Sequence, residues 1–241
     1  MHIKSFRKSR LLRDIWEGSI PTIEEGLLRR MKTGTILDFG CGKGAGMKRF
    51  LRRGWNAVGL DPRLDDLKSA KVYGDVVCAS GEKLPFINMT FDAVISSHVL
   101  HHIANPQKGL QEIFNCLRPG GYLLLAETVE NNPLLRFIRN IHPHYETVPV
   151  RSRYTSDYIR HLIVKDHFAI IEEDSWGLLG LFLAEVAKQI GFLRKYLGSY
   201  PLGMDVLEEY LIKNIKPLRK YCAQYYVLAY GIPRISSAHD T

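Results

Sequence analysis

The sequence lacks the features that mark several classes of protein. Its four cysteines are spread along 241 residues with no CxxC pair, which argues against a disulfide framework and against a zinc ribbon. No apolar run reaches the roughly 20 residues of a membrane span. The charged start of the chain lacks the apolar stretch of a signal peptide. There is no repeat period and no low-complexity segment. These absences favour a globular protein of the reducing cytoplasm.

The composition is that of an ordinary folded protein. Hydrophobic residues make up 46% of the chain and charged residues 24%, so the chain can bury a full core without disulfides or metals. The length is large for one small domain and short for two large ones. We therefore expect one α/β domain with additions.

The positive charge is concentrated at the beginning of the chain. Residues 1–53 contain 13 Lys and Arg against 5 Asp and Glu, and the other 188 residues contain 20 of each, so this segment accounts for the net charge of +8. Such a segment attracts nucleic acid, an anionic membrane surface or an acidic substrate, or it forms a solvated helix face. The apolar spacing over residues 11–16 is helical and predicts docking near the body. We expect a basic helical segment at 1–32 that offers contact to a membrane or a nucleic acid.

From residue 35 the pattern alternates between short apolar runs and helix-like stretches. This alternation is typical of parallel strands joined by crossover helices, and it predicts an α/β fold with a doubly wound, mostly parallel, Rossmann-like sheet. The sequence predicts strands at 35–39, 56–60, 73–78, 91–96, 122–126, 168–174 and 225–230, and helices at 45–53, 64–71 and 105–117.

The alternation breaks after residue 127. Residues 129–155 form a long connection with several prolines, and loops of that length in a compact domain are usually functional or disordered. A helix capped by Thr155 or Ser156 is expected next. Residues 177–193 are almost wholly apolar, which fits a lid over a hydrophobic acceptor, a buried core helix or a membrane contact. We place substrate-side insertions at 129–155 and 177–223, within a C-terminal part spanning 129–241.

A glycine-rich loop directly follows the first predicted strand. The segment ILDFGCGKGAG, residues 36–46, has glycine at alternate positions, which permits a tight turn and close approach of a ligand to the next helix. Gly40, Gly42 and Ala45 satisfy a dinucleotide fingerprint, with Asp61 placed as a ribose acid. The loop therefore indicates a nucleotide-like ligand and leaves its class open.

Asp38 bears on the class of ligand. A carboxylate two residues before Gly40 would repel a pyrophosphate, whereas it would attract a ligand with an ammonium or sulfonium group. This charge argument favours a cation-bearing nucleoside and counts against a nicotinamide oxidoreductase.

Five segments carry a resemblance to one family in that family's order. They are ILDFGCGKGAG at 36–46, GLDP at 59–62, GEKLPF at 81–86, FDAVISSHVLHHI at 91–103 and LRPGGYLLLAE at 117–127. With them the sequence resembles the class I S-adenosylmethionine-dependent methyltransferases, in their small-molecule branch, over residues 33–128, which we take as a cofactor-binding core. The resemblance implies a seven-stranded sheet whose last strand is antiparallel, and the cofactor S-adenosylmethionine with S-adenosylhomocysteine as product. We expect helical additions at both ends of this core.

The resemblance also implies roles for individual residues. Asp38 would hold the methionine ammonium, Asp61 would accept both ribose hydroxyls, and Pro62 would flank the adenine. Where the family often has an acid near the adenine amino group, this chain has Ser80, a departure that weakens that contact. The remaining cofactor-binding candidates are Gly40, Cys41, Gly42 and Gly44 in the loop, Gly81 and Glu82 after Ser80, and Ser96 and Ser97 at the end of the fourth strand.

Three histidines follow the fourth predicted strand, in the order His98, His101 and His102. A neutral imidazole suits removal of a proton from a hydroxyl or phenol acceptor. No carboxylate or cysteine nearby completes a ligand set, so we predict no metal. We name His98 and His102 as candidate catalytic residues, with His98 facing the substrate. For His102 a structural role beneath the cofactor stays open.

The sequence thus predicts methyl transfer from S-adenosylmethionine to a small, hydrophobic or lipid-like acceptor. One alternative is an RNA or protein methyltransferase that docks its substrate on the basic N-terminal segment, which strong salt dependence of binding would favour. Another is a cofactor-binding or scaffold protein without turnover, an interpretation that Ser80 encourages. The acceptor atom and the oligomeric state are not determined by the sequence.

Overall fold

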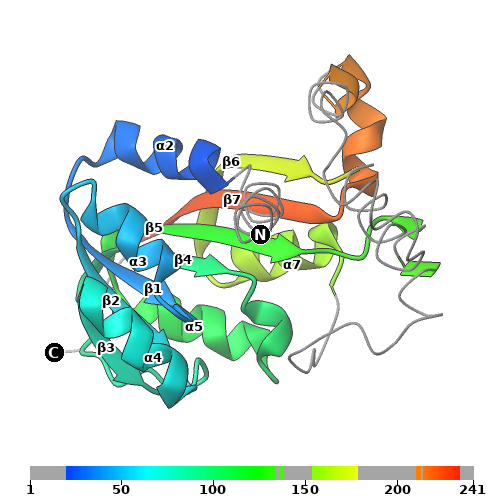
Figure 1. Ribbon diagram of the computed structural model, residues 1–241. Helices are drawn as coiled ribbons and strands as arrows, with labels where there is room; N and C mark the ends of the chain where they lie inside the picture. The colour runs from blue at the N-terminus through cyan, green and yellow to red at the C-terminus, as the bar shows by residue number, and fades with distance from the viewer. Residues whose placement is uncertain (1–19, 134–135, 138–153, 179–209, 213, 234–241) are drawn as a thin grey trace, which may run out of the picture.

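The computed structural model describes residues 20–133, 136–137, 154–178, 210–212 and 214–233. Their central feature is one seven-stranded sheet (Figure 1). Strands β1 to β4 and β5 run parallel, whereas β7 is antiparallel to both of its neighbours, β5 and β6. The predicted mostly parallel sheet with an antiparallel last strand is confirmed. In spatial order the strands are β3 (Asp75–Cys78), β2 (Asn56–Asp61), β1 (Thr35–Phe39), β4 (Phe91–Ser97), β5 (Leu117–Thr128), β7 (Gln224–Gly231) and β6 (Phe168–Trp176).

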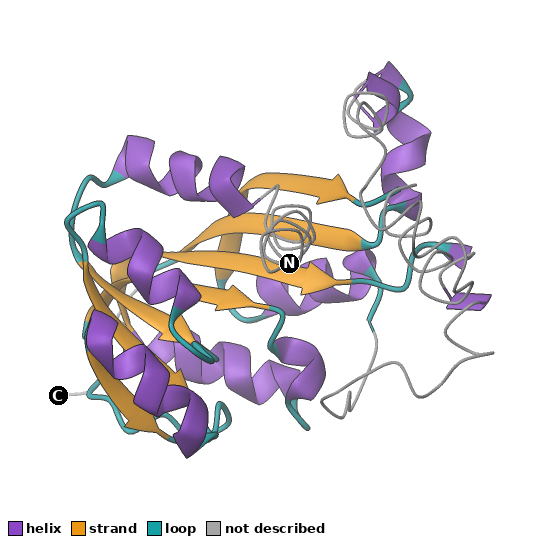
Figure 2. Ribbon diagram, viewed as in Figure 1, coloured by secondary structure: helices purple, strands orange, loops and turns teal. Residues whose placement is uncertain are grey.

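Helices cover both faces of the sheet, as a doubly wound fold requires (Figure 2). Apolar side chains of α2 (Ile20–Arg30), α3 (Ala45–Leu51) and α4 (Leu64–Ala70) pack into the hydrophobic core on one face. Those of α5 (Pro106–Cys116) and α7 (Ser156–Lys165) pack into the core on the other. Among the described residues no helix combines the length and the apolar character needed to cross a membrane.

Local capping signals fix where the two helices of the second face begin. The Asn105 side chain accepts a hydrogen bond from the backbone N–H of Lys108, which satisfies a free donor in the first turn of α5. The Thr155 side chain does the same for Tyr158 at the start of α7. Of the two caps that the sequence left open for this helix, Thr155 is therefore the one used.

The strand β5 is longer than its apolar run predicts. It begins at Leu117 instead of residue 122, so Pro119-Gly120-Gly121, which lie between the predicted helix 105–117 and the predicted strand 122–126, are part of it. The register against β4 shifts between Phe91 and Ala93, so the extra residues are accommodated as an irregularity in the ladder. Gly120 has a φ of 75° there. The strand β3 is shorter than predicted, because Tyr73 belongs to the 3-10 turn η1 (Lys71–Tyr73).

The helix α2 is held by ion pairs that use several of the N-terminal basic residues. Glu24 is completely buried and bonds to Arg49 Nε at 2.8 Å and to Arg53 Nη1 at 3.0 Å. Arg30 Nη1 lies 2.8 Å from Glu172 of β6. These cations are engaged in holding the fold.

Several predictions fall on residues that the structure does not describe, among them most of the connection 129–155 and of the insertion 177–223. The expected helix over residues 11–16 lies outside the described residues. So does the apolar stretch 177–193, apart from Gly177 and Leu178.

Candidate functional site

A cavity of about 560 Å³ lies at the carboxyl edge of the sheet, where β1, β2 and β4 end. The helices that follow β1 and β4, namely α3 and α5, lie on opposite faces, so this is the point at which the winding of the sheet reverses. Open α/β sheets bind their ligands at such a point. The predicted site residues that line the cavity are Gly40, Asp61, Pro62, Ser80, Gly81, Glu82, Ser97, His98 and His102.

Position 40 requires glycine, both because of its backbone conformation and because a side chain has no room there. Its φ is 75°, a left-handed conformation that side chains disfavour, and a Cβ added here would overlap the side chain of Val99. The N–H groups of Gly40 and Cys41 both donate to the carbonyl of Leu60, at 2.7 and 2.9 Å. The loop is thereby fixed against the end of β2, with bare backbone at the cavity wall.

The other loop residues serve the fold around the cavity and do not line it. A Cβ on Gly44 would meet Tyr73 and Ala70, so this glycine allows close packing with the α4 region. Cys41 is buried, and burial raises the pKa of its thiol to about 12, which keeps it protonated and unreactive. All four cysteines lie in the described part of the chain and carry thiols.

Asp38 lies beneath the glycine loop and is not part of the cavity wall. Its side chain is 5% exposed, and Oδ2 accepts a hydrogen bond from the backbone N–H of Met47 at 2.9 Å. Burial raises the pKa of this carboxyl to about 6, with the Met47 N–H as the largest opposing influence. The group is ionised at neutral pH. Direct contact with a ligand cation therefore stays a prediction, while the position of the carboxyl beneath the loop is a feature of the structure.

Asp61 combines contacts within the fold with a place on the cavity wall. Its Oδ2 accepts from the backbone N–H of Gly42 at 3.0 Å, and its Oδ1 accepts from the backbone N–H of Arg63 at 2.8 Å. Each carboxylate oxygen has further lone pairs, so these bonds fix the carboxylate and leave it able to accept from a ligand. The Arg63 side chain, half-exposed, extends beside it with Nε at 3.4 Å.

The segment Ser80-Gly81-Glu82 forms another part of the wall. The Ser80 hydroxyl accepts from the backbone N–H of Glu82, and Glu82 Oε1 accepts from the backbone N–H of Asn105 at 2.9 Å. A Cβ on Gly81 would lie 2.6 Å from the Phe39 ring. The two polar side chains thus hold the segment in place, and bare backbone at Gly81 allows it to approach β1.

The two serines at the end of β4 differ in position. Ser97 lines the cavity, whereas Ser96 is buried and its hydroxyl has no hydrogen-bond partner among the described residues. Successive residues of a strand point to opposite faces, which is why one of a pair faces the ligand side. Cofactor contact by Ser96 gains no support from this geometry.

The histidines continue directly from β4. His98 has a φ of 57°, its backbone N–H donates to the carbonyl of Ala126, and its Nδ1 lies 3.1 Å from Thr128 Oγ1. Burial of the ring lowers its pKa, which keeps the imidazole neutral at physiological pH. His102 also lines the cavity, in the 3-10 turn η2 (Leu100–His102). His101 is directed elsewhere, onto the buried carboxylate of Glu127.

Sequence reasoning missed part of the wall. The sequence analysis does not name the apolar residues before and after the recognised motif residues as site candidates, nor Arg63, although it follows Asp61-Pro62 directly. The position of Arg63 just beyond a strand end was a usable signal. The missed lining residues are Phe39, Leu60, Arg63, Val99, Ile103 and Ala104.

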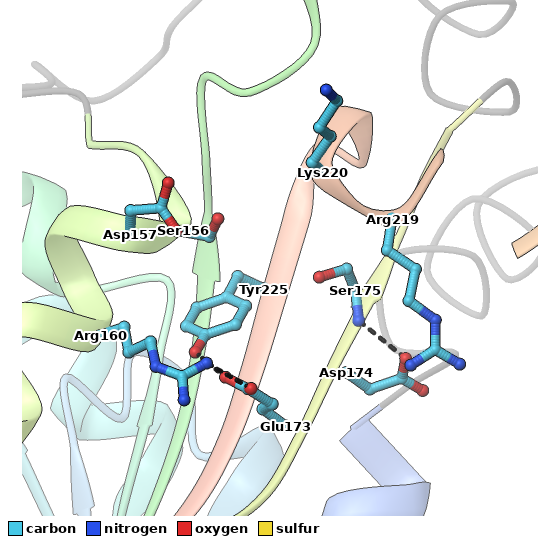
Figure 3. A pocket seen from close by; sticks show the side chains of 9 residues that line it. All are labelled: Ser156, Asp157, Arg160, Glu173, Asp174, Ser175, Arg219, Lys220 and Tyr225. Atoms are coloured by element: carbon cyan, nitrogen blue, oxygen red, sulfur yellow. Dashed lines mark hydrogen bonds and ion pairs between the residues drawn. The ribbon is translucent and has the colours of Figure 1, made fainter. Parts of the chain in front are cut away.

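A second, smaller pocket of about 190 Å³ lies across β7 and β6 and is lined by polar and charged residues (Figure 3). At its base the Tyr225 hydroxyl donates to Glu173 Oε2 at 2.6 Å, and Arg160 pairs with the same carboxylate. It shares no residue with the glycine-loop cavity, and its lining does not suit an apolar molecule. Across the described residues no cluster of His, Cys, Asp and Glu is arranged to hold a metal ion.

The matches to known proteins cover the same part of the chain as the motifs of the cofactor-binding core. Residues 37–125 match the family model described as a methyltransferase domain. An uncharacterized methyltransferase of Mycobacterium sp. (strain KMS) is 33% identical over 126 residues, 51% of this chain and 47% of that protein. A ubiquinone biosynthesis O-methyltransferase of Parvibaculum lavamentivorans is 32% identical over 98 residues, 38% of this chain and 39% of that protein. The chain spans about half the length, or less, of these curated relatives.

A solved structure extends the likeness in fold beyond that core. In a complex of the Haloferax volcanii Trm112 methyltransferase activator with a methyltransferase, the similar chain superposes with a TM-score of 0.61 at 19% identity, covering 94% of both chains. At this identity the likeness concerns the fold alone.

Proposed function

We propose that the protein is a class I methyltransferase that transfers a methyl group from S-adenosylmethionine to a small, hydrophobic or lipid-like acceptor; the match of residues 37–125 to a methyltransferase domain supports this. The observation that carries the proposal is the cavity formed where the glycine loop, Asp61 and the histidine turn meet.

The residues of the cavity fit the proposed cofactor. Its volume lies within the range typical of small-molecule sites. The fixed Asp61 carboxylate supplies an acceptor for ribose hydroxyls, and Gly40 presents backbone without a side chain. The ionised Asp38 beneath the loop favours a ligand that carries positive charge. Pro62, which is exposed and lies next to Asp61, offers an apolar surface for a base.

When bound, S-adenosylmethionine supplies an electrophilic methyl group on a positively charged sulfur. The contribution of the chain is to place the acceptor in line and to exclude water, which in the best intramolecular models is worth roughly 7–11 kcal/mol. For an acceptor with a hydroxyl, we assign His98 as the group that takes up the released proton. Its lowered pKa keeps the ring neutral and able to accept, and Thr128 Oγ1 at Nδ1 orients it.

The acceptor class is proposed on two grounds. Apolar side chains that are at least partly exposed, namely Pro62, Val99 and Ala104, form part of the cavity wall. One relative acts in ubiquinone biosynthesis, and apolar quinone precursors are acceptors of this class. Arg30, Arg49 and Arg53 are engaged in ion pairs, and the basic residues before residue 20, on which the RNA alternative rests, lie outside the described residues. The cytoplasmic location and the division into 1–32, 33–128 and 129–241 stay predictions.

Replacing His98 by alanine is expected to lower turnover by on the order of 10²- to 10⁴-fold, the usual contribution of a general base, with a much smaller change in cofactor affinity. The assay follows tritium transfer from S-adenosylmethionine labelled at the methyl group, with an isoprenoid-substituted phenol, a fatty acid and bulk RNA as acceptors. The exposed His161 of α7 provides the matched control, and His161→Ala is expected to behave as wild type.

Unchanged turnover in His98→Ala would remove this residue from the mechanism. Label that appears in RNA and in neither small molecule would contradict the proposed acceptor class while leaving methyl transfer intact.

A further inference from the structure

Glu127 is a carboxylate completely buried at the end of β5. Burying a charge is costly unless hydrogen bonds compensate for the lost water. Glu127 Oε2 accepts from the backbone N–H of Leu100 at 2.9 Å, and Oε1 accepts from the backbone N–H of Thr128 at 2.9 Å. Oε1 also bonds to Nδ1 of His101. The side chain therefore joins β5 to the turn that follows β4.

Residues at the end of β5 contact both ends of the turn that follows β4. Strands β4 and β5 lie side by side and point in the same direction (Figure 1). The carbonyl of Ala126 accepts from the backbone N–H of His98, and Thr128 Oγ1 lies beside the His98 ring. Glu127, between these two residues, holds Leu100 and His101. Three consecutive residues of one strand thus fix the segment that carries both cavity histidines.

The bond to His101 also determines the surroundings of His102. The rings of His101 and His102 are in contact, with centroids 4.0 Å apart and planes tilted by 52°. Glu127 holds the His101 ring in place, and the His102 ring packs against His101. His102 in turn lines the cavity. His98, at a φ of 57°, is held in its left-handed conformation by the bond from its N–H to Ala126 and by Thr128 beside its ring.

We propose that Glu127, through His101, is a positioning residue for methyl transfer that keeps His98 and His102 in their orientation at the cavity. This inference rests on the proposed function of the cavity. Glu127 does not line the cavity, so its effect is transmitted by the turn.

Glu127→Gln is the sharpest test, because glutamine keeps the shape and replaces one acceptor oxygen by an NH₂ group. That donor then faces either the N–H of Leu100 or the groups bonded to Oε1, so the turn loses at least one of its ties. Turnover is expected to fall by on the order of 10²-fold, as for a reacting group displaced by about 1 Å. The affinity for S-adenosylhomocysteine should change much less.

A spectroscopic readout makes the test independent of the acceptor. In the wild type, ¹⁵N spectra of the full-length protein are expected to show one ring tautomer for His98 and one for His102, and averaged signals in Glu127→Gln. The control is Glu24→Gln, since Glu24 is equally buried but lies on α2 and bonds to Arg49 and Arg53. It should cost stability and leave both the histidine spectra and turnover as in wild type.

The outcomes separate the two proposals. Failure of the wild type to bind S-adenosylhomocysteine would overturn the function of the cavity. Binding by the wild type with unchanged histidine spectra in Glu127→Gln, or with equal changes in Glu24→Gln, would overturn the positioning role alone.

Discussion

Gly40→Ala is expected to weaken binding of S-adenosylhomocysteine by about 10- to 100-fold and to destabilise the fold. The added Cβ overlaps the side chain of Val99, and overpacking of this kind costs about 1–3 kcal/mol. Because Gly40 and Val99 both line the cavity, relief of the overlap displaces the cavity wall itself. Titration calorimetry measures the affinity, and urea unfolding measures the stability.

The chain provides a matched control in Gly120. Its φ is also 75°, but nothing lies within 4 Å of the position that a Cβ would take. Gly120→Ala should therefore incur only the backbone cost, roughly 1 kcal/mol, with no loss of affinity. In the double variant Gly40→Ala/Val99→Ala the overlapping methyl groups are gone, and most of the affinity lost in Gly40→Ala should return. Equal effects of Gly40→Ala and Gly120→Ala would contradict this account of the loop.

Asp38→Asn is expected to stabilise the protein at neutral pH while weakening the binding of a cationic ligand. The folded pKa of about 6 lies above the ordinary value of 3.8, so the folded state binds the proton more tightly than the unfolded chain. This contribution to stability is complete below pH 4 and is lost as the pH rises through 6. A difference of about two pKa units corresponds to about 3 kcal/mol.

The unfolding free energy of Asp38→Asn minus that of wild type should therefore rise by about 2 kcal/mol between pH 4 and pH 7.5, since part of the full difference is already present at pH 4. Taking this difference cancels the other titrating groups, which the two proteins share. At pH 7.5 the variant should bind S-adenosylhomocysteine about tenfold more weakly, because about 1.4 kcal/mol of attraction to the ligand ammonium is lost. A constant stability difference across this pH range would show that Asp38 is not the buried charge described here.

The sequence was sufficient for the sheet and for the place of the site. The alternation of strands and helices predicts the sheet, and the glycine loop after β1 predicts the place of the site, because both patterns are local properties of the sequence. The sequence did not predict how the individual loop residues pack. Gly44 packs on Tyr73, and Asp38 is turned under the loop, because partners distant in sequence determine both positions.

The sequence missed other structural features for the same physical reason. Glu127 was visible only as the last residue of a strand motif, and its bonds to Leu100 and His101 arise from pairing of β4 with β5. The irregularity in the ladder between β4 and β5 likewise depends on the register of the two strands, whereas Pro119 and the glycines after it locally favour a turn. Contacts across strands decide these features, and a pattern along one chain does not contain them.

The central claim is that the cavity behind the glycine loop binds the sulfonium nucleoside of methyl transfer. Titration calorimetry with S-adenosylmethionine, S-adenosylhomocysteine and a nicotinamide dinucleotide, each added to the full-length protein, tests it most directly. The account predicts saturable one-to-one binding of the first two ligands, weakened in Gly40→Ala and unchanged in Gly120→Ala, and no binding of the third. Binding of the dinucleotide alone would contradict it.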